Sequence, residues 1–310
     1  MTTLLVSTVG GHLTQLHSLV PRLPIGDRVW VTTESAQSKS LLAGEEVHYL
    51  HFPRARNIGD VARNAVAGIR HLPHRNVERV ISTGANIALS VLPLYWARGV
   101  PCHFIESATR VAGPSESGRL LSRLPGMRLY TQHESWSDHK WAYHGTVLDG
   151  FQGVRTAPRE VKRVVVTMGS AEGYPFRRPI ERLLEILPPE VEVLWQTGWT
   201  DVSDLGIDAR RSVPAHEMEA AMAEADVVIA HAGTGSTVTA LMNGRVPLLL
   251  PRLKELGEHV DDHQSELAAM LEKRGLAMVR DAGSVTWDDV LEASSFRVET
   301  TSRTPFHLKP

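Results

Sequence analysis

Short apolar runs alternate with amphipathic stretches along most of the chain, and this alternation starts afresh near its middle. The runs have the length of buried strands, and the stretches between them carry apolar residues at helical spacing. Such an alternation predicts parallel sheets with helices on their faces. The 310 residues suffice for two domains, each with its own core. We therefore predict an α/β fold of two doubly wound, Rossmann-like domains, residues 1–156 and 157–310, that face a cleft.

The predicted strands are residues 4–8, 28–32, 47–50, 77–82, 103–105, 128–131, 164–167, 191–196, 210–213, 227–230, 247–250 and 277–279. The predicted helices are residues 13–23, 58–72, 87–97, 117–124, 176–187, 215–223, 234–243, 262–273 and 287–293. The polar tail from residue 294 is either a strap across the surface or a frayed end.

Composition excludes several classes of protein. No run of 18 apolar residues is present, so the sequence predicts no membrane-spanning helix. The N-terminus lacks the basic region of a signal peptide and has the pattern of a first strand. The single cysteine, Cys102, excludes an internal disulfide and a cysteine-based metal cage. We expect a cytoplasmic protein without a nucleic-acid partner, and the sequence predicts no oligomeric state.

Charge is divided unevenly between the two halves. Residues 1–155 hold 16 Lys and Arg against 11 Asp and Glu, whereas residues 156–310 hold 17 against 24. A basic first half fits an anionic membrane surface or a phosphorylated acceptor. Chance asymmetry in arginine-rich helices is the competing interpretation.

The segment His231-Ala-Gly-Thr-Gly-Ser236 follows one predicted strand and opens a predicted helix. Gly233 and Gly235 let the backbone approach a ligand closely, and the N–H groups of a helix start suit a diphosphate. His231 either orients this loop or contacts the nucleotide. Thr234 and Ser236 either cap the helix or bind phosphate oxygens.

A second glycine turn, Gly169-Ser170, follows the first predicted strand of the same half. Its N–H groups and hydroxyl can meet a phosphate, although a simple turn is the alternative. Two glycine turns at strand ends can hold a diphosphate from two sides.

The polar segment from Glu258 to Gln264 carries side chains that hydrogen-bond sugar hydroxyls, among them His263. A solvated polar loop is one alternative. A metal site is another, because His259 and His263 are four residues apart. The predicted helix begins near Asp261 and leaves His259 in the loop, so we expect no metal.

In the first half, Gly10-Gly11-His12 follows the first strand directly. A histidine with a pKa near neutrality suits a general base that deprotonates a hydroxyl nucleophile, although His12 can also simply cap the next helix. Glu106 follows another strand, where it can orient His12, hold an acceptor hydroxyl or serve as an ordinary helix-start carboxylate.

A loop of small residues, 82–86, follows the fourth strand and faces the predicted cleft. It contains Thr83, Gly84 and Asn86, and it suits the diphosphate of an acceptor.

These motifs together resemble a known family. The second half is similar to the donor domain of glycosyltransferase family 28, especially that of the dolichol-linked chitobiose N-acetylglucosaminyltransferase and its bacterial exopolysaccharide relatives. The first half resembles the membrane-recruiting partner subunit of the eukaryotic enzyme, so the chain looks like a fusion of two subunits. The matching residues are 231–236, 244–247, 251–252 and 258–264 in the second half, and 11–15, 81–84, 104–107 and Arg110 in the first.

The resemblance implies a GT-B fold and inverting transfer from a UDP-sugar, with UDP-N-acetylglucosamine as one candidate. The implied acceptor is a lipid-linked glycan on a polyprenyl diphosphate, in envelope or exopolysaccharide synthesis. Carried over by position, His12 is the base, residues 169–170 and 233–236 hold the diphosphate, and His263 and Gln264 hold the sugar. Gly10, Gly11 and Arg110 fall on the acceptor side. No metal or other cofactor is implied.

Two departures from the family matter. Thr239 stands where the family often has a glutamate that holds the nucleotide ribose, and a hydroxyl cannot accept two ribose hydroxyls as a carboxylate does. The chain also begins at the first strand, without the partner subunit's membrane helix. Contact with the inner face of the cell membrane would then be peripheral, through the helix 58–72 with Arg63 and Arg70 and the loop 54–56. A nucleotide-sugar 2-epimerase and a non-catalytic binding subunit are the alternative functions.

Overall fold

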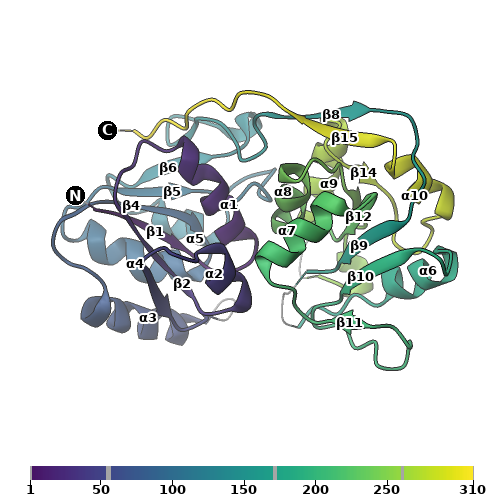
Figure 1. Cartoon of the computed structure of the whole chain (residues 1–310). Helices are drawn as coiled ribbons and strands as arrows, with labels where there is room; N and C mark the ends of the chain where they lie inside the picture. The colour runs from purple at the N-terminus through teal and green to yellow at the C-terminus, as the bar shows by residue number, and fades with distance from the viewer. Residues whose placement is uncertain (1, 54–56, 170–172, 260–261, 310) are drawn as a thin grey trace. The chain divides into compact units, whose positions relative to one another are not determined.

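The computed structural model describes residues 2–53, 57–169, 173–259 and 262–309. Contacts divide the chain into two compact units (Figure 1), one of residues 1–149 with 303–310 and one of residues 150–302. The sequence predicts a division after residue 156 and a second domain that includes the tail. Two contacts explain the difference. Strand β8 (Phe151–Arg155) pairs with β15 (Phe296–Thr300) in the second unit, and Phe306 is fully buried in the first.

The first unit is built on a seven-stranded parallel sheet in the order β3-β2-β1-β4-β5-β6-β7. Its strands are β1 (Thr2–Ser7), β2 (Arg28–Thr33), β3 (Val47–Leu50), β4 (Val77–Gly84), β5 (Cys102–Ile105), β6 (Arg128–Thr131) and β7 (Trp141–Tyr143). Its helices are α1 (Gly11–Leu19), α2 (Ala36–Leu41), α3 (Ile58–His71), α4 (Asn86–Trp96) and α5 (Glu116–Leu121), with short 3-10 turns η1 (Val20–Arg22) and η2 (Glu134–Trp136). The order is that of a doubly wound sheet, whose ligands gather at the carboxyl ends of the strands.

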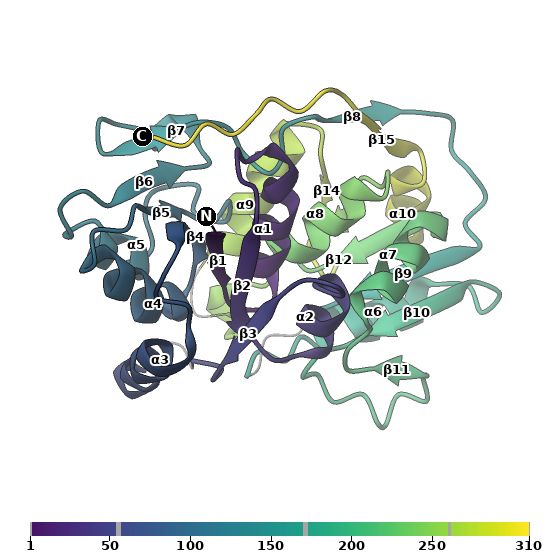
Figure 2. The ribbon, with the colours of Figure 1, turned by 60° about the vertical axis from the view of Figure 1, so that its left-hand side comes forward.

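Apolar residues of β1 and β4 form the core of this unit together with the inner face of α4. Helix α3 packs against α4, and Gly68 makes that approach possible because a Cβ there would lie 3.0 Å from Leu94. The last residues of the chain lie beside β6, where the Lys309 N–H donates to the Tyr130 hydroxyl at 2.7 Å. Figure 2 shows this yellow segment along the β6 and β7 edge. Residues 303–310 of the predicted tail therefore form a strap on the first unit, whereas residues 296–300 form strand β15 of the second.

The second unit repeats the plan with the parallel order β11-β10-β9-β12-β13-β14. Its strands are β9 (Arg163–Thr167), β10 (Glu192–Gln196), β11 (Ala209–Arg210), β12 (Val227–Ala230), β13 (Leu248–Leu249) and β14 (Met278–Val279), beside the antiparallel pair of β8 and β15. Its helices are α6 (Arg178–Ile186), α7 (Ala215–Glu224), α8 (Thr234–Met242), α9 (His263–Lys273) and α10 (Trp287–Ala293), with the 3-10 turn η3 (Lys254–Leu256). Both sheets are parallel, as the sequence predicts.

Both faces of the second sheet are covered. Residues of α6 and α10 form a core on one face, and residues of α7 and α8 pack against the other. Strands β9 and β12 lie at the centre, buried on both faces, which explains why their sequences are continuous apolar runs. Among the described residues, no helix combines the length and the apolar character that crossing a bilayer requires.

Candidate functional site

The turn after β1 places His12 in the first turn of α1. Gly10 has a φ of +89°, which a glycine adopts without strain. The Nδ1 of His12 lies 2.7 Å from the carbonyl oxygen of Thr83 at the end of β4, and the Thr83 hydroxyl donates to the His12 carbonyl at 2.8 Å. A carbonyl only accepts, so this contact places the ring proton on Nδ1 and leaves Nε2 with a lone pair.

Electrostatics keep the His12 ring neutral. Burial lowers the pKa of His12 below its usual value, the bond to Thr83 partly opposes this, and the positive charge of Arg110 lowers the pKa further. Arg110 is half-buried in the turn after β5. Its charge therefore acts on the pKa of His12 from a segment other than α1. A neutral imidazole with a fixed tautomer has the properties of a general base.

Glu106 lies at the end of β5, as predicted, but its carboxylate does not orient His12. It is 1% exposed and accepts from the N–H of Ser107 at 3.0 Å and from both the N–H and the hydroxyl of Ser115 at 2.8 Å. Ser115 in turn caps α5. The partner of His12 is the Thr83 carbonyl, and Glu106 instead fixes the loop that precedes α5.

A buried pair of amides ties α1 to this loop. The Nε2 of Gln15 donates to the Ser107 hydroxyl at 3.0 Å, and its Oε1 accepts from the Ala108 N–H at 2.9 Å. Gln132, which follows β6, donates to the same Gln15 oxygen at 2.9 Å and to the Glu106 carbonyl at 2.9 Å. Sequence reasoning leaves both glutamines out of the site, because only the fold brings them together.

The loop 82–86 combines two unusual backbone conformations at the start of α4. Gly84 has a φ of +112° and lies so close to His12 that a Cβ would stand 3.3 Å from the ring. Ala85, the N-cap residue of α4, has a φ of +62°, which is strained for a residue with a side chain, and it makes no side-chain cap bond. Asn86 is the first residue of that helix. Thr83, Gly84 and Asn86 therefore lie at the carboxyl edge where the acceptor loop is predicted.

In the second unit, the ring of His231 fills the space between the two predicted glycine turns. A Cβ on Gly169 would lie 2.6 Å from His231 Nε2, and a Cβ on Gly233 would overlap the same atom. His231 Nδ1 lies 3.3 Å from the Thr167 carbonyl. Burial lowers the pKa of His231 to about 3, and the nearby charge of Arg252 contributes to that shift. The structure thus brings Gly169, His231 and Gly233 together, while Ser170 lies outside the described residues.

Helix α8 begins at Thr234 without a side-chain cap among the described residues, so the capping alternative for Thr234 and Ser236 is not seen, and phosphate binding stays a prediction. The Thr234 hydroxyl is buried and has no hydrogen-bond partner in the part of the chain that the structure describes. Gly235 and Ser236 follow in the first turn, half-buried, and Thr239 lies one turn further along with its side chain partly exposed. This helix start offers N–H groups and a hydroxyl to an anion.

The predicted donor-sugar residues are spread around the loop after β13. The Glu258 carboxylate is already engaged, because it accepts from Arg178 at 3.0 and 3.1 Å and from the Leu253 N–H at 2.9 Å. Gln264 is buried in α9, and its Oε1 accepts from the Arg252 N–H at 3.1 Å. His263 lies 3.6 Å from Glu266 on the same helix. Glu258 therefore links this loop to Arg178, and its contact with the donor sugar stays a prediction.

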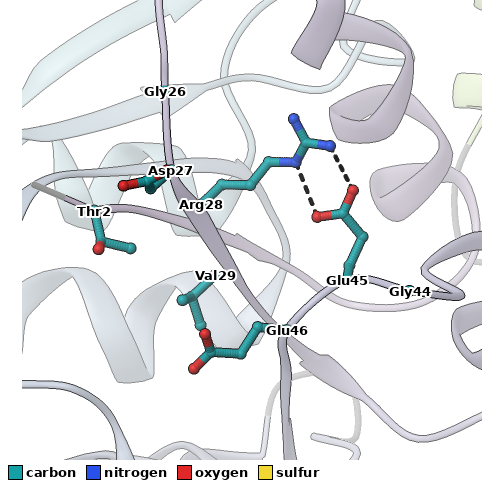
Figure 3. Close-up of a pocket in the computed structure, with 8 residues that line it drawn as sticks. All are labelled: Thr2, Gly26, Asp27, Arg28, Val29, Gly44, Glu45 and Glu46. Carbon is teal, nitrogen blue, oxygen red and sulfur yellow. Dashed lines mark hydrogen bonds and ion pairs between the residues drawn. The ribbon is translucent and has the colours of Figure 1, made fainter.

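Two cavities complete the picture. One of about 500 Å³ is lined by Leu253, Lys254, Glu255 and Asp262, beside the start of α9. The other, about 560 Å³, lies at the amino ends of β1 and β2, where Arg28 pairs with Glu45 (Figure 3). This is the opposite edge of the sheet from His12. No group of three or more potential metal ligands occurs among the described residues, and metal independence stays a prediction.

Part of the second half of the chain is similar to a known family. Residues 163–285 match the family model of the glycosyltransferase family 28 C-terminal domain. A curated relative, the UDP-N-acetylglucosamine transferase subunit ALG13 of Cryptococcus neoformans, is 43% identical over 65 residues, which are 21% of this chain and 31% of that protein. The match therefore spans less than a third of the relative's length.

Solved structures match nearly the whole chain. MurG of Acinetobacter baumannii is similar with a TM-score of 0.56 and 16% identity, over 94% of this chain and 89% of that one. The spinosyn rhamnosyltransferase SpnG, solved with thymidine diphosphate, matches with a TM-score of 0.54 and 18% identity, over 95% and 91%. At these identities the likeness establishes the fold, which is that of the GT-B glycosyltransferases.

Proposed function

We propose that this chain, whose residues 163–285 match the family 28 C-terminal domain, transfers a sugar from a UDP-sugar to a lipid-linked glycan acceptor with inversion. UDP-N-acetylglucosamine is the candidate donor, since the curated relative is named for that sugar nucleotide. A polyprenyl-diphosphate-linked glycan is the candidate acceptor. The observation that carries the proposal is the 2.7 Å contact between His12 Nδ1 and the Thr83 carbonyl, which implies that the neutral ring has no proton on Nε2.

In the proposed reaction, an acceptor hydroxyl oxygen attacks the anomeric carbon and its proton passes to His12 Nε2. The bond from that carbon to the donor's diphosphate oxygen breaks, and its electron pair leaves with the nucleoside diphosphate. The start of α8, with His231 and Thr234, is the proposed place for the leaving diphosphate, because uncapped N–H groups stabilise the developing charge. We also propose that this step requires no metal.

A thermal-shift screen tests the donor half of the proposal. At about 100 times its dissociation constant, a ligand adds about 2.7 kcal/mol to stability, which is readily measured. We expect a shift with UDP that EDTA does not change. GDP and TDP belong in the screen because Thr239 replaces the usual glutamate. No shift with any nucleoside diphosphate would contradict the proposed donor site.

Transfer itself is tested by incubating UDP-N-acetylglucosamine with and without a polyprenyl-diphosphate-linked sugar acceptor. UDP release that depends on the acceptor supports the proposal. NMR of the donor with enzyme alone distinguishes the alternatives, because inversion at C2 would identify an epimerase. Binding of the donor without transfer or hydrolysis would identify a non-catalytic subunit.

Helix α3 supports a peripheral membrane contact as a further part of the proposal, because its polarity is inverted. Ile58, Val66 and Ile69 are 84, 49 and 50% exposed, whereas Asp60 and Asn64 are buried. The buried Asn64 side chain bonds both the N–H and the carbonyl of His51.

Arg63 and Arg70 are exposed on the same helix and complement anionic lipid. The Arg54 to Arg56 loop, also predicted to make contact, lies outside the described residues. We propose that this face of α3 rests on an anionic bilayer. Flotation with vesicles of anionic and of zwitterionic lipid tests it. Ile69→Asp should reduce binding to the anionic vesicles, while Leu256→Asp, at a site of similar exposure in the second unit, should not.

A further inference from the structure

Arg252 bridges the two ends of the segment that follows β9. It stands three residues after β13 and is 3% exposed. Its Nη2 donates to the Met168 carbonyl at 2.8 Å and to the Tyr174 carbonyl at 3.0 Å. These two carbonyls flank the stretch that begins with Gly169. One buried guanidinium therefore bonds the backbone both before and after Gly169.

No carboxylate pairs with this guanidinium among the described residues. Its neighbour over the plane is the Phe176 ring, 4.8 Å away. Glu258 contributes a favourable charge, but its oxygens are bonded to Arg178 and Leu253. The Arg252 Nε has no hydrogen-bond partner in the described chain. Burial lowers the pKa of Arg252 to about 10, so the side chain still carries its charge at neutral pH.

Fold stability does not explain a buried charge that has no ionic partner in the described part of the chain. Removing a charge from water is costly, and apolar replacements of buried charged groups are often neutral or stabilising. The two carbonyl bonds offset part of this cost, but a neutral amide would supply a donor too. The positive charge of Arg252 is therefore the property that a functional role has to explain.

The field of this charge reaches the space between the two glycine turns. Arg252 lowers the pKa of His231, whose ring lies between Gly169 and Gly233. The Arg252 backbone also donates to Gln264, which links the same residue to α9. An anion placed at the glycine turns would lie in this positive potential, in a poorly solvated setting where charge interactions are strong.

We infer that Arg252 is a positioning residue for the donor's diphosphate: it bonds the backbone carbonyls of Met168 and Tyr174 on either side of Gly169, and it supplies a positive charge, paired with no carboxylate of the described residues, that the diphosphate neutralises. This inference rests on the proposed function. Arg252 takes no part in bond making or proton transfer.

The test compares Arg252→Gln, which removes the charge, with Arg252→Lys, which keeps it. The probes are UDP, UMP, uridine and inorganic pyrophosphate, titrated by calorimetry or ligand-observed NMR. We expect Arg252→Gln to lower the affinity for UDP and for pyrophosphate by about ten-fold. The affinity for UMP should fall by less, and that for uridine by less than about two-fold. Arg252→Lys should keep the affinity for UDP within about three-fold of the wild-type value. The ratio of UDP to uridine affinity does not depend on the folded fraction, so partial unfolding does not obscure the result.

Arg245→Gln is the matched control, because Arg245 is half-buried and also donates to two backbone carbonyls, those of Met222 and Ala223. It should leave the ratio unchanged. An equal loss for UDP and uridine in Arg252→Gln, or no loss, would overturn the inference while the proposed function stands. Wild-type protein that binds neither UDP nor pyrophosphate would overturn the proposed function and the inference together.

Discussion

The Nδ1 of His12 lies 2.7 Å from the carbonyl oxygen of Thr83, and the Thr83 hydroxyl returns a bond to the His12 carbonyl. This reciprocal pair joins the first turn of α1, which follows β1, to the end of the neighbouring strand β4. A carbonyl can hold the Nδ1 proton in place without adding a negative charge beside the ring. A carboxylate would add one. The ring is therefore oriented while its pKa stays low, which leaves Nε2 ready to accept a proton at neutral pH.

Replacing His12 tests this role directly. We expect His12→Ala to lower turnover by about 100-fold or more, the scale of a lost general base, while UDP affinity is retained. Steady-state kinetics and a UDP titration measure the two quantities. His17→Ala on the same helix, where the ring contacts Trp30, is the control and should keep turnover close to normal. Unchanged turnover in His12→Ala would remove His12 from the mechanism.

Gly84 controls the position of the same ring. Its φ is +112°, and a Cβ added there would stand 3.3 Å from His12 Cε1, so alanine is unfavourable on two grounds. Gly84→Ala should therefore lower turnover more than UDP affinity. Gly99→Ala is the matched control, since Gly99 also has a positive φ, +76°, but has open space around it. If both variants lose turnover equally, backbone strain rather than displacement of the His12 ring explains the effect.

Much of this fold is predictable from the sequence. Central strands such as β9 and β12 are continuous apolar runs, and glycines mark the turns that follow them, so strands and turns both leave local signals. The edge elements β7 and α2 are short and give weak periodicity. The pairing of β8 with β15 joins segments about 140 residues apart, and no local pattern reports such a contact.

The site follows the same division. Local motifs place His12, Gly169 and His231 at strand ends, and the structure brings the last two together. The partner of a buried polar group is a non-local property, so sequence reasoning misses Thr83 as the partner of His12 and Arg252 as the anchor of the Gly169 turn. Glu106 shows the converse, because a carboxylate at a strand end looks catalytic until its bonds to Ser107 and Ser115 are seen.

Glu106→Gln separates a structural from a catalytic role. The amide would turn a donor toward an N–H of Ser107 or Ser115, and such a mismatch of buried groups costs about 1–3 kcal/mol. We expect a lower melting temperature with turnover reduced by less than about ten-fold, because the carboxylate's bonds go to Ser107 and Ser115 rather than to His12. A fall in turnover on the His12→Ala scale without loss of stability would instead assign Glu106 to the chemistry.

A double-mutant cycle tests the close packing of the His231 ring between Gly169 and Gly233, which we call the His231 wedge. Gly233 has a φ of −89°, so alanine fits the backbone there, and the three atoms nearest to its Cβ all belong to the His231 ring. Gly233→Ala should destabilise the protein by about 1–3 kcal/mol and weaken UDP binding, and His231→Ala should relieve most of the stability cost. Gly169→Ala should stay costly in that background, because Gly169 has a φ of +77°. Additive effects of Gly233→Ala and His231→Ala would contradict the wedge.

Stability should fall in mild acid because two histidines are held neutral inside the fold. Burial lowers the pKa of His103 and of His231 from 6.5 to about 3. Below pH 6.5 the unfolded chain binds these protons and the folded protein does not, so their contribution is intact above that pH and is lost progressively toward pH 3.

Each histidine then lowers the free energy of unfolding by about 1.4 kcal/mol per pH unit in that window. His103 is 2% exposed, with its Nδ1 2.9 Å from the Tyr130 hydroxyl. The same hydroxyl accepts from the Lys309 N–H at 2.7 Å. Denaturant unfolding of wild type and His103→Gln between about pH 6 and pH 4 measures the difference in slope, and the variant should be less sensitive to acid. His139→Gln, at an exposed position, is the control. Parallel pH profiles for wild type and His103→Gln would show that His103 accepts a proton within the folded state.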